Sequence, residues 1–369
     1  MGVYESLGVK RVINAWGPMT RIGSARVRPE VVAAMAEAAG AYVDLIDLQR
    51  AAGRRLAQMI GVEACYLCGG SAAGLAIATA ACVTGTDMAR LARLPDTSGM
   101  RHEVVIRRSH RNPYDHAVRQ VGVRLVEIGN AWVTYDWELE AAIGPQTAAV
   151  VYVYGHRTMH EPLSLRETVE IAHARDVPVV VDAAAEVPPA RNLSGLSQTG
   201  ADVVIISGGK GLRGPQNSAL VLLSSSRMLE ACILNGAPNH SLGRSMKVTK
   251  EDMVGLVKAV ELYLALDHQT VARGWEEDVA QIIAALQDIP GVCVVRDEAL
   301  YSEGIPVARI TVDPQVAGRS AAEVASALAD GDPAIRVTRI RDWLSINPQF
   351  LEAGEVCQVT ARLAQVLRA

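Results

Sequence analysis

The chain has 369 residues, of which 50% are hydrophobic and 21% are charged, and its formal net charge is −4. This composition is typical of a soluble globular protein with room for one large and one small domain, and it lacks the strongly basic balance of a nucleic-acid-binding protein. Residues 1–10 lack the apolar core of a signal peptide and no apolar run has the length of a membrane span. We therefore expect a cytoplasmic protein without a nucleic-acid or membrane partner.

Six cysteines are scattered along the chain, and Cys65 and Cys68 form the only motif-like pair. A zinc site would need a second pair, and a thioredoxin-like role would place the pair at the start of a helix, whereas here it falls in a predicted strand. We therefore expect buried free thiols and no metal site.

Residues 1–44 are predicted to form an extended arm followed by a helix. The helix is expected at 29–39, because Pro29 suits the first helical position. A second helix is expected at 47–60, where apolar residues recur at helical spacing.

The stretch 60–74 is predicted to form a strand, a glycine turn and the start of a helix. Gly69 and Gly70 precede Ser71, and an alanine-rich helix is expected from Ala72 to about residue 83. The free N–H groups at a helix start and the Ser71 hydroxyl form an anion site, although many helices begin in this way. We expect Gly70, Ser71 and Ala72 to bind a phosphate group.

Strands and helices then alternate, which predicts a mostly parallel sheet flanked by helices in a large domain at 45–245. The strands are expected at 104–107, 124–128, 148–154, 178–182, 202–206 and 219–223, and the helices at 136–143 and 165–174.

A smaller α+β domain is expected at 246–369. A long helix at 251–267 is predicted to lead into it. Its other elements are expected to be helices at 275–288 and 320–329 and strands at 292–296, 306–312 and 335–339.

Two of the buried strands end in residues with cofactor chemistry. The strand at 178–182 ends in Asp182, and the strand at 202–206 is followed by Ser207, two glycines and Lys210, 28 positions after Asp182 (210 − 182). Open α/β sheets bind ligands at the carboxyl ends of their strands. This spacing favours a pyridoxal phosphate (PLP) site in which Lys210 forms the Schiff base and Asp182 pairs with the pyridine nitrogen.

Other interpretations of this pair remain open. Lys210 could be a solvated lysine in a glycine loop, and Asp182 a helix cap after a strand. A phosphate-binding P-loop is disfavoured, because Val204 stands at its first glycine position and Gly211 follows the lysine. The neighbouring glycines are expected to let the backbone approach a bound group.

Five segments together resemble the fold-type-I PLP enzymes related to bacterial L-seryl-tRNA(Sec) selenium transferase, and most closely the branch with D-glucosaminate-6-phosphate ammonia-lyase. The resemblance spans nearly the whole chain, and GGKGLRGPQ at 208–216 is its strongest part. The segments are INAWGPMTRIGS at 13–24, DLQRAAGRRLAQMIGVEACYLCGGSAAGLAIATAA at 47–81, RRSHRNPYD at 107–115, VVVDAAAE at 179–186 and SGGKGLRGPQ at 207–216.

The resemblance implies a fold-type-I PLP-dependent transferase fold, which is α/β with a mostly parallel sheet in the large domain and a smaller C-terminal α+β domain. It also implies further cofactor contacts. His110 is our choice for the ring that stacks on the pyridine, with His116 as the alternative. Ala184, Ser207 and Gln216 are expected to complete the cofactor site.

The resemblance further implies a homodimer or higher homo-oligomer in which the N-terminal arm edges a shared site. Thr20 and Arg21 in the arm are then candidate substrate contacts, and His156 after a strand is another. An arginine of the small domain is expected to bind the substrate carboxylate, either Arg336 or Arg339, which point to opposite faces of one strand. Removing residues 1–23 should lower activity more than folding.

The implied activity is that of a PLP-dependent lyase. It would remove the α-proton of a small amino acid or amino sugar acid and eliminate a β-substituent, giving an oxo acid and ammonia. The alternatives are an amino acid racemase or epimerase on the same scaffold and a non-catalytic relative that binds PLP. Residues 347–349 read Asn-Pro-Gln where related enzymes read Asp-Pro-Arg, so the family's substrate does not carry over directly.

Overall fold

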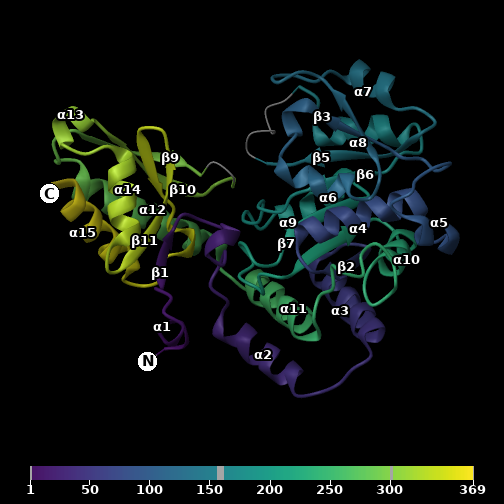
Figure 1. Cartoon of the computed structure of the whole chain (residues 1–369), viewed down its shortest axis with the longest axis horizontal. Helices are drawn as coiled ribbons and strands as arrows, with labels where there is room; N and C mark the ends of the chain where they lie inside the picture. Colours follow the sequence, from purple (N-terminus) through teal and green to yellow (C-terminus); the bar gives the residue numbers. More distant parts are fainter. Residues whose placement is uncertain (1, 156–161, 300–301, 369) are drawn as a thin grey trace. The chain divides into compact units, whose positions relative to one another are not determined.

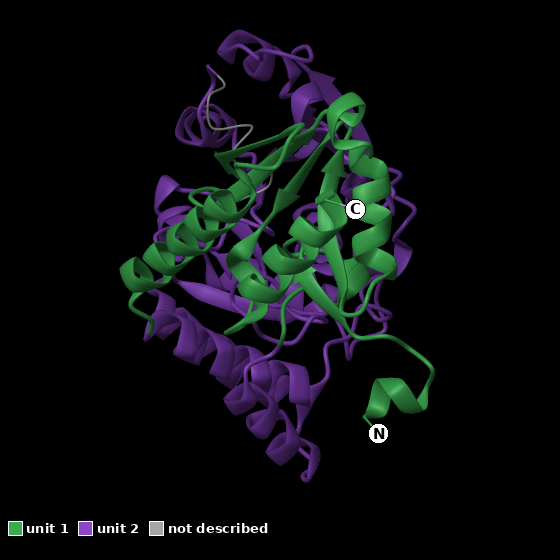
Figure 2. Cartoon of the chain, turned by 90° about the vertical axis from the view of Figure 1, so that its left-hand side faces the viewer, with its two compact units in different colours: residues 1–26, 266–369 green, residues 27–265 purple. Residues whose placement is uncertain are grey.

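The computed structural model describes residues 2–155, 162–299 and 302–368, and the candidate His156 lies outside these ranges. The chain divides into two compact units, residues 27–265 and residues 1–26 with 266–369, as Figures 1 and 2 show. The sequence placed the domain boundaries at 44/45 and 245/246 instead. The first 26 residues thus belong to the same unit as the C-terminal part of the chain.

The larger unit, residues 27–265, alternates strands and helices. Its helices and 3₁₀ turns are α2 (Pro29–Ala39), α3 (Leu45–Ile60), α4 (Ser71–Thr84), α5 (Met88–Arg93), η2 (Arg108–His110), η3 (Pro113–Asp115), α6 (His116–Arg119), α7 (Asp136–Ala142), α8 (Leu165–His173), α9 (Asn192–Gly195), η4 (Ser197–Thr199), α10 (Ser226–Asn235) and α11 (Lys250–Leu264). Its strands are β2 (Ala64–Cys68), β3 (Glu103–Arg107), β4 (Arg124–Ile128), β5 (Thr147–Val153), β6 (Val179–Asp182), β7 (Val203–Ser207) and β8 (Ala219–Leu223).

Within the described residues these strands form a seven-stranded sheet in the order β2-β8-β7-β6-β5-β3-β4. β3 to β7 are mutually parallel, and β8 is antiparallel to both of its neighbours. Strands β6, β7 and β8 are continuous apolar runs because helices cover both faces of such a sheet. The predicted mostly parallel sheet is confirmed.

Helix α4 packs closely on this sheet because its residues are small. A β-carbon on Gly74 would stand 3.1 Å from Ile205 on β7 and 3.2 Å from Val221 on β8. The helix is buried almost all round, with α10 and α6 against its other side. This packing fixes the start of α4 at the sheet edge where β2 ends.

The smaller unit is α+β. It contains α1 (Val3–Ser6), β1 (Val12–Ala15), η1 (Thr20–Ile22), α12 (His268–Leu286), β9 (Val292–Glu298), β10 (Pro306–Val312), α13 (Pro314–Ala317), α14 (Ala321–Asp330), β11 (Ala334–Ile340), β12 (Trp343–Ile346), η5 (Pro348–Phe350) and α15 (Glu355–Arg368). Among the residues described, its sheet has the strand order β1-β11-β12-β10-β9, in which only β1 and β11 pair in parallel.

The N-terminal arm is therefore built into the smaller unit rather than lying free. Ile13 and Ala15 of β1 are buried in the core of that unit, and the backbone N–H of Asn347 donates to the Ala15 carbonyl at 3.0 Å. Removing residues 1–23 would take away an edge strand and part of a hydrophobic core. We therefore expect this truncation to lower stability as well as activity.

The predicted long helix at 251–267 ends earlier, at Leu264, and α12 begins at His268. The break follows from Asp267, whose carboxylate accepts hydrogen bonds from the backbone N–H groups of Gln269 and Thr270. An N-cap of this kind starts a new helix.

The expectation of buried thiols is partly confirmed. Cys65, Cys68 and Cys232 are buried, whereas Cys293 and Cys357 are exposed. Burial raises the pKa of the Cys68 thiol to about 12, which makes it a poor nucleophile at neutral pH.

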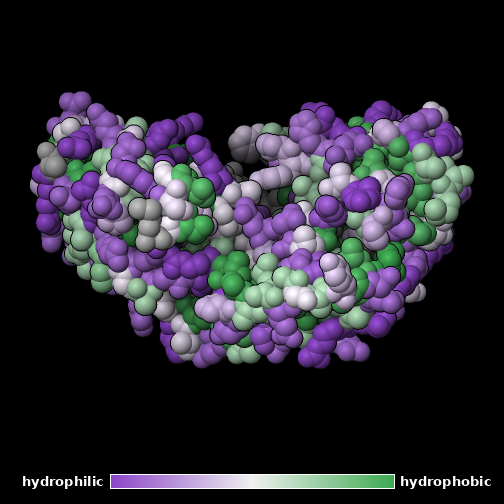
Figure 3. Space-filling model, turned by 60° about the horizontal axis from the view of Figure 1, so that its bottom comes forward, coloured by the Kyte–Doolittle hydropathy of each residue, from purple (hydrophilic) through white to green (hydrophobic). Residues whose placement is uncertain are grey.

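The face of the molecule seen in Figure 3 is mainly hydrophilic. No helix of the described ranges has the length and apolarity required to cross a bilayer.

Candidate active site

The candidate residues of the larger unit gather at one edge of its sheet. In the parallel ladders Val153 pairs with Asp182 and Asp182 pairs with Ile205, so the carboxyl ends of β5, β6 and β7 lie side by side. β2 runs in the same direction as β7, since both are antiparallel to β8, and its carboxyl end leads into α4. The topology thus brings Asp182, Lys210 and Ser71 to the same edge.

Lys210 lies in a compact loop between β7 and β8. Gly208 donates to the Ser218 carbonyl at 2.9 Å and Gly214 donates to the Gly208 carbonyl at 2.9 Å, which closes the loop around the lysine. The N–H of Arg213 donates to the Lys210 carbonyl, also at 2.9 Å. Lys210 itself is half-buried.

The close contacts of the glycines in this loop are with other parts of the protein. A β-carbon on Gly211 would stand 1.8 Å from the Val187 carbonyl oxygen, so the close approach is to the protein's own backbone. None of Gly208, Gly209, Gly211 and Gly214 has a positive φ; the left-handed residue of the loop is Arg213, with φ 54°. These glycines therefore allow dense packing of the loop.

Asp182 and Lys210 oppose the effect of burial on one another. Burial raises the pKa of Asp182, while the positive charge of Lys210 and the N–H of Ala184 partly offset this rise. Burial lowers the pKa of Lys210, while the negative charges of Asp182 and Glu186 oppose this fall. A lysine with a lowered pKa gives up its proton more readily, which suits a nucleophile or proton carrier.

Ala184 and Ser207 lie directly beside this pair. The Ala184 N–H donates to Oδ1 of Asp182 at 3.1 Å, and the Ser207 N–H donates to the Ala184 carbonyl at 3.3 Å. Asp182 is only 9% exposed, so the Ala184 hydrogen bond fixes a buried carboxylate. The predicted residues Asp182, Ala184 and Ser207 are thus adjacent.

Ser71 begins α4 at the same sheet edge. Its hydroxyl oxygen is buried and, within the described residues, has no hydrogen-bond partner. Gly70 precedes it with φ 101°, a conformation that favours glycine, and no side chain caps the helix. A buried hydroxyl without a partner at a helix N-terminus is what an anion site requires before its ligand binds.

His110 is buried at the end of β3, with 2% of its surface exposed. Its Nδ1 accepts a hydrogen bond from the Val153 N–H at 3.1 Å, and its ring meets Tyr152 edge to face with centroids 4.7 Å apart. Burial, and then the charge of Arg107, lowers the pKa of His110 to about 3. The alternative, His116, is exposed at the start of α6, where its Nδ1 lies 3.0 Å from Arg119.

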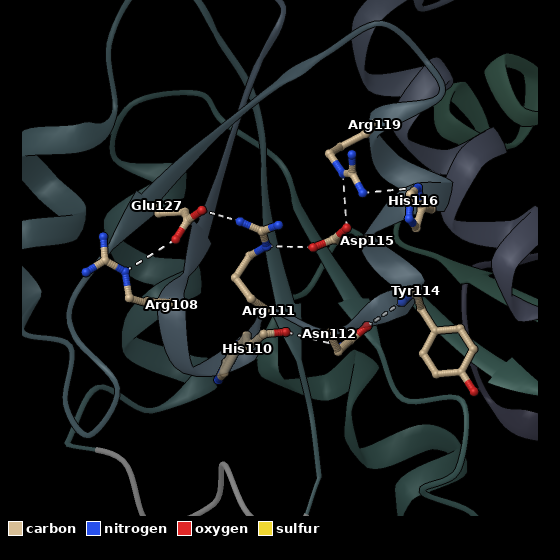
Figure 4. Close-up of polar contacts among 9 residues, drawn as sticks. All are labelled: Arg108, His110, Arg111, Asn112, Tyr114, Asp115, His116, Arg119 and Glu127. Carbon is tan, nitrogen blue, oxygen red and sulfur yellow. Dashed lines mark hydrogen bonds and ion pairs between the residues drawn. The ribbon is translucent and has the colours of Figure 1, made fainter.

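Ion pairs hold the segment 108–119 in place, as Figure 4 shows. Nε of Arg111 lies 2.6 Å from Oδ2 of Asp115, and Nε of Arg119 lies 3.0 Å from Oδ1 of the same carboxylate. Arg111 also pairs with Glu127 on β4, which Arg108 contacts at 3.3 Å. This network links the segment to the edge strand β4.

The segment also encloses a small cavity beside Asp182. The cavity is lined in part by Val153, Asn112, Tyr114 and Asp115. The side chain of Asn112 donates to the His110 carbonyl at 3.2 Å and accepts from the Tyr114 N–H at 2.8 Å. The loop after β3 is thereby positioned next to the end of β6.

Sequence reasoning missed Glu186. Its side chain is 4% exposed, and a β-carbon on Gly155 would stand 3.2 Å from its Oε1. The signal was present in the sequence, since Glu186 stands four positions after Asp182 in the quoted VVVDAAAE segment. Glu186 is thus a second buried acidic residue whose charge acts on Lys210.

The remaining candidates are distributed as follows. Gln216 is exposed, and its backbone lies beside Gly209, the neighbour of Lys210. Thr20, Arg21 and Arg336 are exposed residues of the smaller unit, where Arg336 of β11 pairs with Asn14 of β1.

Gln349, where we expect the sequence to differ from related enzymes, is buried in the smaller unit. Its Oε1 has no hydrogen-bond partner among the residues described.

Comparison of the sequence with known proteins shows two similar enzymes. The chain is 36% identical over 375 residues to D-glucosaminate-6-phosphate ammonia lyase of Salmonella typhimurium, covering 99% of this chain and 97% of that protein. It is 34% identical over 377 residues to 5'-C-glycyluridine monooxygenase-decarboxylase of a Streptomyces species, covering 99% and 92%.

Solved structures show the same likeness. A solved structure of D-glucosaminate-6-phosphate ammonia-lyase matches with a TM-score of 0.86 at 35% identity, covering 100% of this chain and 98% of that one. Ureidoglycine-glyoxylate aminotransferase from Bacillus subtilis, at 16% identity, has a TM-score of 0.62, covers 97% and 93%, and shares the fold. The fold is that of the fold-type-I PLP enzymes. Residues 12–273 match the family model described as L-seryl-tRNA selenium transferase, and the chain belongs to that family.

Proposed function

We propose that this chain is a PLP-dependent lyase that acts on a small amino acid or amino sugar acid. It removes the α-proton and eliminates a β-hydroxyl as water; hydrolysis of the product then uses one water, so the net products are an oxo acid and ammonia. The observation that carries the proposal is the half-buried Lys210, whose charge interacts with that of the buried Asp182 carboxylate at the carboxyl edge of a parallel sheet. The likeness to an ammonia lyase favours this reaction over others.

The residues at the sheet edge fit PLP. The Ser71 hydroxyl, buried and without a partner in the part of the chain described, and the amide groups at the start of α4 offer donors for the phosphate. Lys210 would hold the cofactor, and Asp182 would accept a hydrogen bond from the ring nitrogen. When bound, PLP supplies a sink for the electron pair left at Cα when its proton is removed.

We assign separate roles to the residues around the cofactor site. Lys210 is the proposed proton acceptor, since burial has already lowered its pKa. His110 would cover one face of the ring, with Ala184, Ser207 and Gln216 completing the cofactor site. Thr20, Arg21, His156 and Arg336 stay proposals as substrate contacts.

A homodimer is also proposed. Apolar residues that a solvated monomer would leave exposed occur in both units, including Tyr42 and Val43 before α3 and Val3, Tyr4 and Leu7 at the N-terminus. Exposed apolar groups of this extent suit an interface with a second copy. Light scattering on the purified protein tests this, and a monomer at working concentrations contradicts it. The cytoplasmic location stays a prediction.

The activity test begins with purified protein and added PLP. We expect a visible absorption band that Lys210→Ala abolishes, and release of ammonia and an oxo acid from one member of a panel of D- and L-3-hydroxy amino acids and amino sugar acids, including D-glucosaminate 6-phosphate. Loss of optical rotation without ammonia would identify a racemase, and oxygen consumption with carbon dioxide release would match the name of the second relative, a monooxygenase-decarboxylase. A protein with the band but no turnover would be a non-catalytic relative, and the absence of the band would overturn the proposal.

A further inference from the structure

We infer that His110 is a permanently neutral hydrogen-bond donor at Nε2 and does not accept protons during the reaction. The inference begins with one backbone hydrogen bond, in which the N–H of Val153 on β5 donates to Nδ1 of His110 at 3.1 Å. An atom that accepts a hydrogen from an amide carries no hydrogen itself. A neutral imidazole has one N–H group, so the hydrogen must be on Nε2.

The ring cannot easily leave this geometry. Val153 belongs to the parallel ladder and pairs with Asp182, so its amide is held by the sheet. Tyr152 meets the imidazole edge to face at 77°, and the side chain of Asn112 donates to the His110 carbonyl. A flipped ring would leave the Val153 N–H facing a carbon atom in a site with 2% exposure, which costs a buried hydrogen bond.

The charges around the ring also oppose a second proton. From β3, the Arg107 guanidinium lies 4.6 Å from the centroid of Tyr152, the same ring that contacts His110, and it donates to the Thr168 hydroxyl at 2.7 Å. β5 contributes the neutral Tyr152 ring. β6 contributes Asp182, whose pKa burial raises, while Lys210 and the Ala184 N–H partly offset that rise.

The charged side chains on the segment of His110 are also paired, Arg111 with Asp115 of the same segment and Arg108 with Glu127 of β4 (Figure 4). Burial and the Arg107 charge both lower the pKa of His110. A protonated His110 is therefore disfavoured by three features. The Val153 N–H donates to Nδ1, the ring is buried, and Arg107 carries a positive charge.

The catalytic consequence rests on the proposed function. A residue that donates at Nε2 and is blocked at Nδ1 can hold an acceptor atom in place, and it cannot take the α-proton of a substrate. Proton removal is left to Lys210, and a racemase that uses His110 as a second base on the other face is not served by this site. Arg107 and Tyr152 are positioning residues, because they act on the chemistry only through the ring of His110.

The test is direct detection of the histidine tautomers by NMR in the full chain, as purified with PLP and again after PLP removal. With ¹⁵N-labelled histidine and valine, the His110 ring should show an unprotonated Nδ1 and a protonated Nε2, unchanged from about pH 5 to pH 8. A coupling across the hydrogen bond from the Val153 amide nitrogen to Nδ1 assigns the signal without mutation. His116→Gln serves as the matched control, since it removes a histidine of the same segment and should leave the signal in place.

A protonated Nδ1, or a His110 signal that titrates within that pH range, would overturn the inference. The proposed function can fail separately, because the tautomer is measured in the protein with and without PLP and needs no turnover. Arg107→Gln should raise the pH at which His110 takes up a second proton, whereas Arg107→Lys, which keeps the charge, should raise it less. Equal midpoints for Arg107→Gln and the wild type would overturn the positioning role of Arg107.

Discussion

Gly209 and Gln216 approach so closely that a β-carbon on Gly209 would stand 2.5 Å from the Cα of Gln216. No real β-carbon makes such a close contact with backbone atoms. Gly209→Ala must therefore displace the loop segment that carries Lys210. Overpacking of this kind costs about 1–3 kcal/mol of unfolding free energy. We expect weakened PLP retention together with a lower unfolding midpoint.

Gly195→Ala is the matched control for that variant, because a β-carbon there meets open space. Dialysis followed by absorbance, with urea unfolding on the same samples, measures both effects. If Gly209→Ala retained PLP as firmly as Gly195→Ala, the packing of this loop would not be what positions the lysine.

Asp182→Asn should leave PLP bound but slow turnover. The substitution keeps the shape of the side chain and its acceptor for the Ala184 N–H, while it removes the negative charge beside the ring nitrogen. We expect kcat to fall by about 10²–10⁴-fold, or roughly 3–5 kcal/mol in activation free energy. Steady-state kinetics with a PLP occupancy measurement is the check, and near-normal turnover would reduce Asp182 to a structural cap.

Glu186→Gln should shift the protonation of Lys210. The negative charge of Glu186 opposes the lowering of the Lys210 pKa by burial, so removing that charge lets the pKa fall further. The neutral amine then forms at lower pH, and the rate at which PLP-free protein captures PLP should rise at lower pH than in the wild type. Stopped-flow absorbance across a pH series detects this, and an unchanged pH profile would mean that Glu186 acts only in packing against Gly155.

Ser71→Ala tests the phosphate contact. Losing a hydrogen bond to a charged group costs about 1.5–3 kcal/mol, which corresponds to roughly 10- to 100-fold weaker PLP binding. Thr79→Val in the same helix is the control, because that hydroxyl donates to the Leu75 carbonyl at 2.7 Å and faces no ligand. PLP titration by fluorescence compares the two; equal affinities would place the phosphate elsewhere.

His110 should make the fold sensitive to acid. Its pKa is 6.5 in the unfolded chain and about 3 in the folded protein. Below pH 6.5 the unfolded state binds a proton that the folded state refuses, so stability falls as pH falls through that window, by about 1.4 kcal/mol per pH unit. Between about pH 7.5 and pH 5 the loss should be about 2 kcal/mol.

His110→Gln supplies the comparison, because the Gln oxygen can still accept from Val153 and does not titrate. Urea unfolding at the two pH values should show the smaller loss in the variant. Identical losses in both proteins would mean that the buried histidine is not the group responsible.

Much of the larger unit could be predicted from its sequence because its signals are local. The runs that became β6 and β7 are continuous and β-branched, and the residues that follow them, Asp182 and Lys210, meet at one edge as parallel strands require. The burial of Arg107 and Glu186 could not be predicted in this way, although Glu186 stands only four positions after Asp182. A charged residue is normally solvated, and only the packed fold shows that both are buried.

The strand pairing of the smaller unit was harder to predict, because it does not depend on local signals in the sequence. The pairing of Val12 with Ala334 joins positions 322 apart (334 − 12), and no local pattern announces such a pair. The N-cap at Asp267 was a local signal for the start of a new helix. It was missed because apolar residues recur at helical spacing on both sides of it.

That distant pairing has a consequence for how the protein is made. Residues 27–265 leave the ribosome as one continuous unit, whereas β1 emerges early and must wait for β11, which is translated more than three hundred residues later. During that interval Ile13 and Ala15 have no core to enter, and an unpaired strand is free to pair with other nascent chains. Slow or interrupted synthesis between the two strands should therefore favour aggregation, and chaperones that hold short extended segments should matter most during this interval.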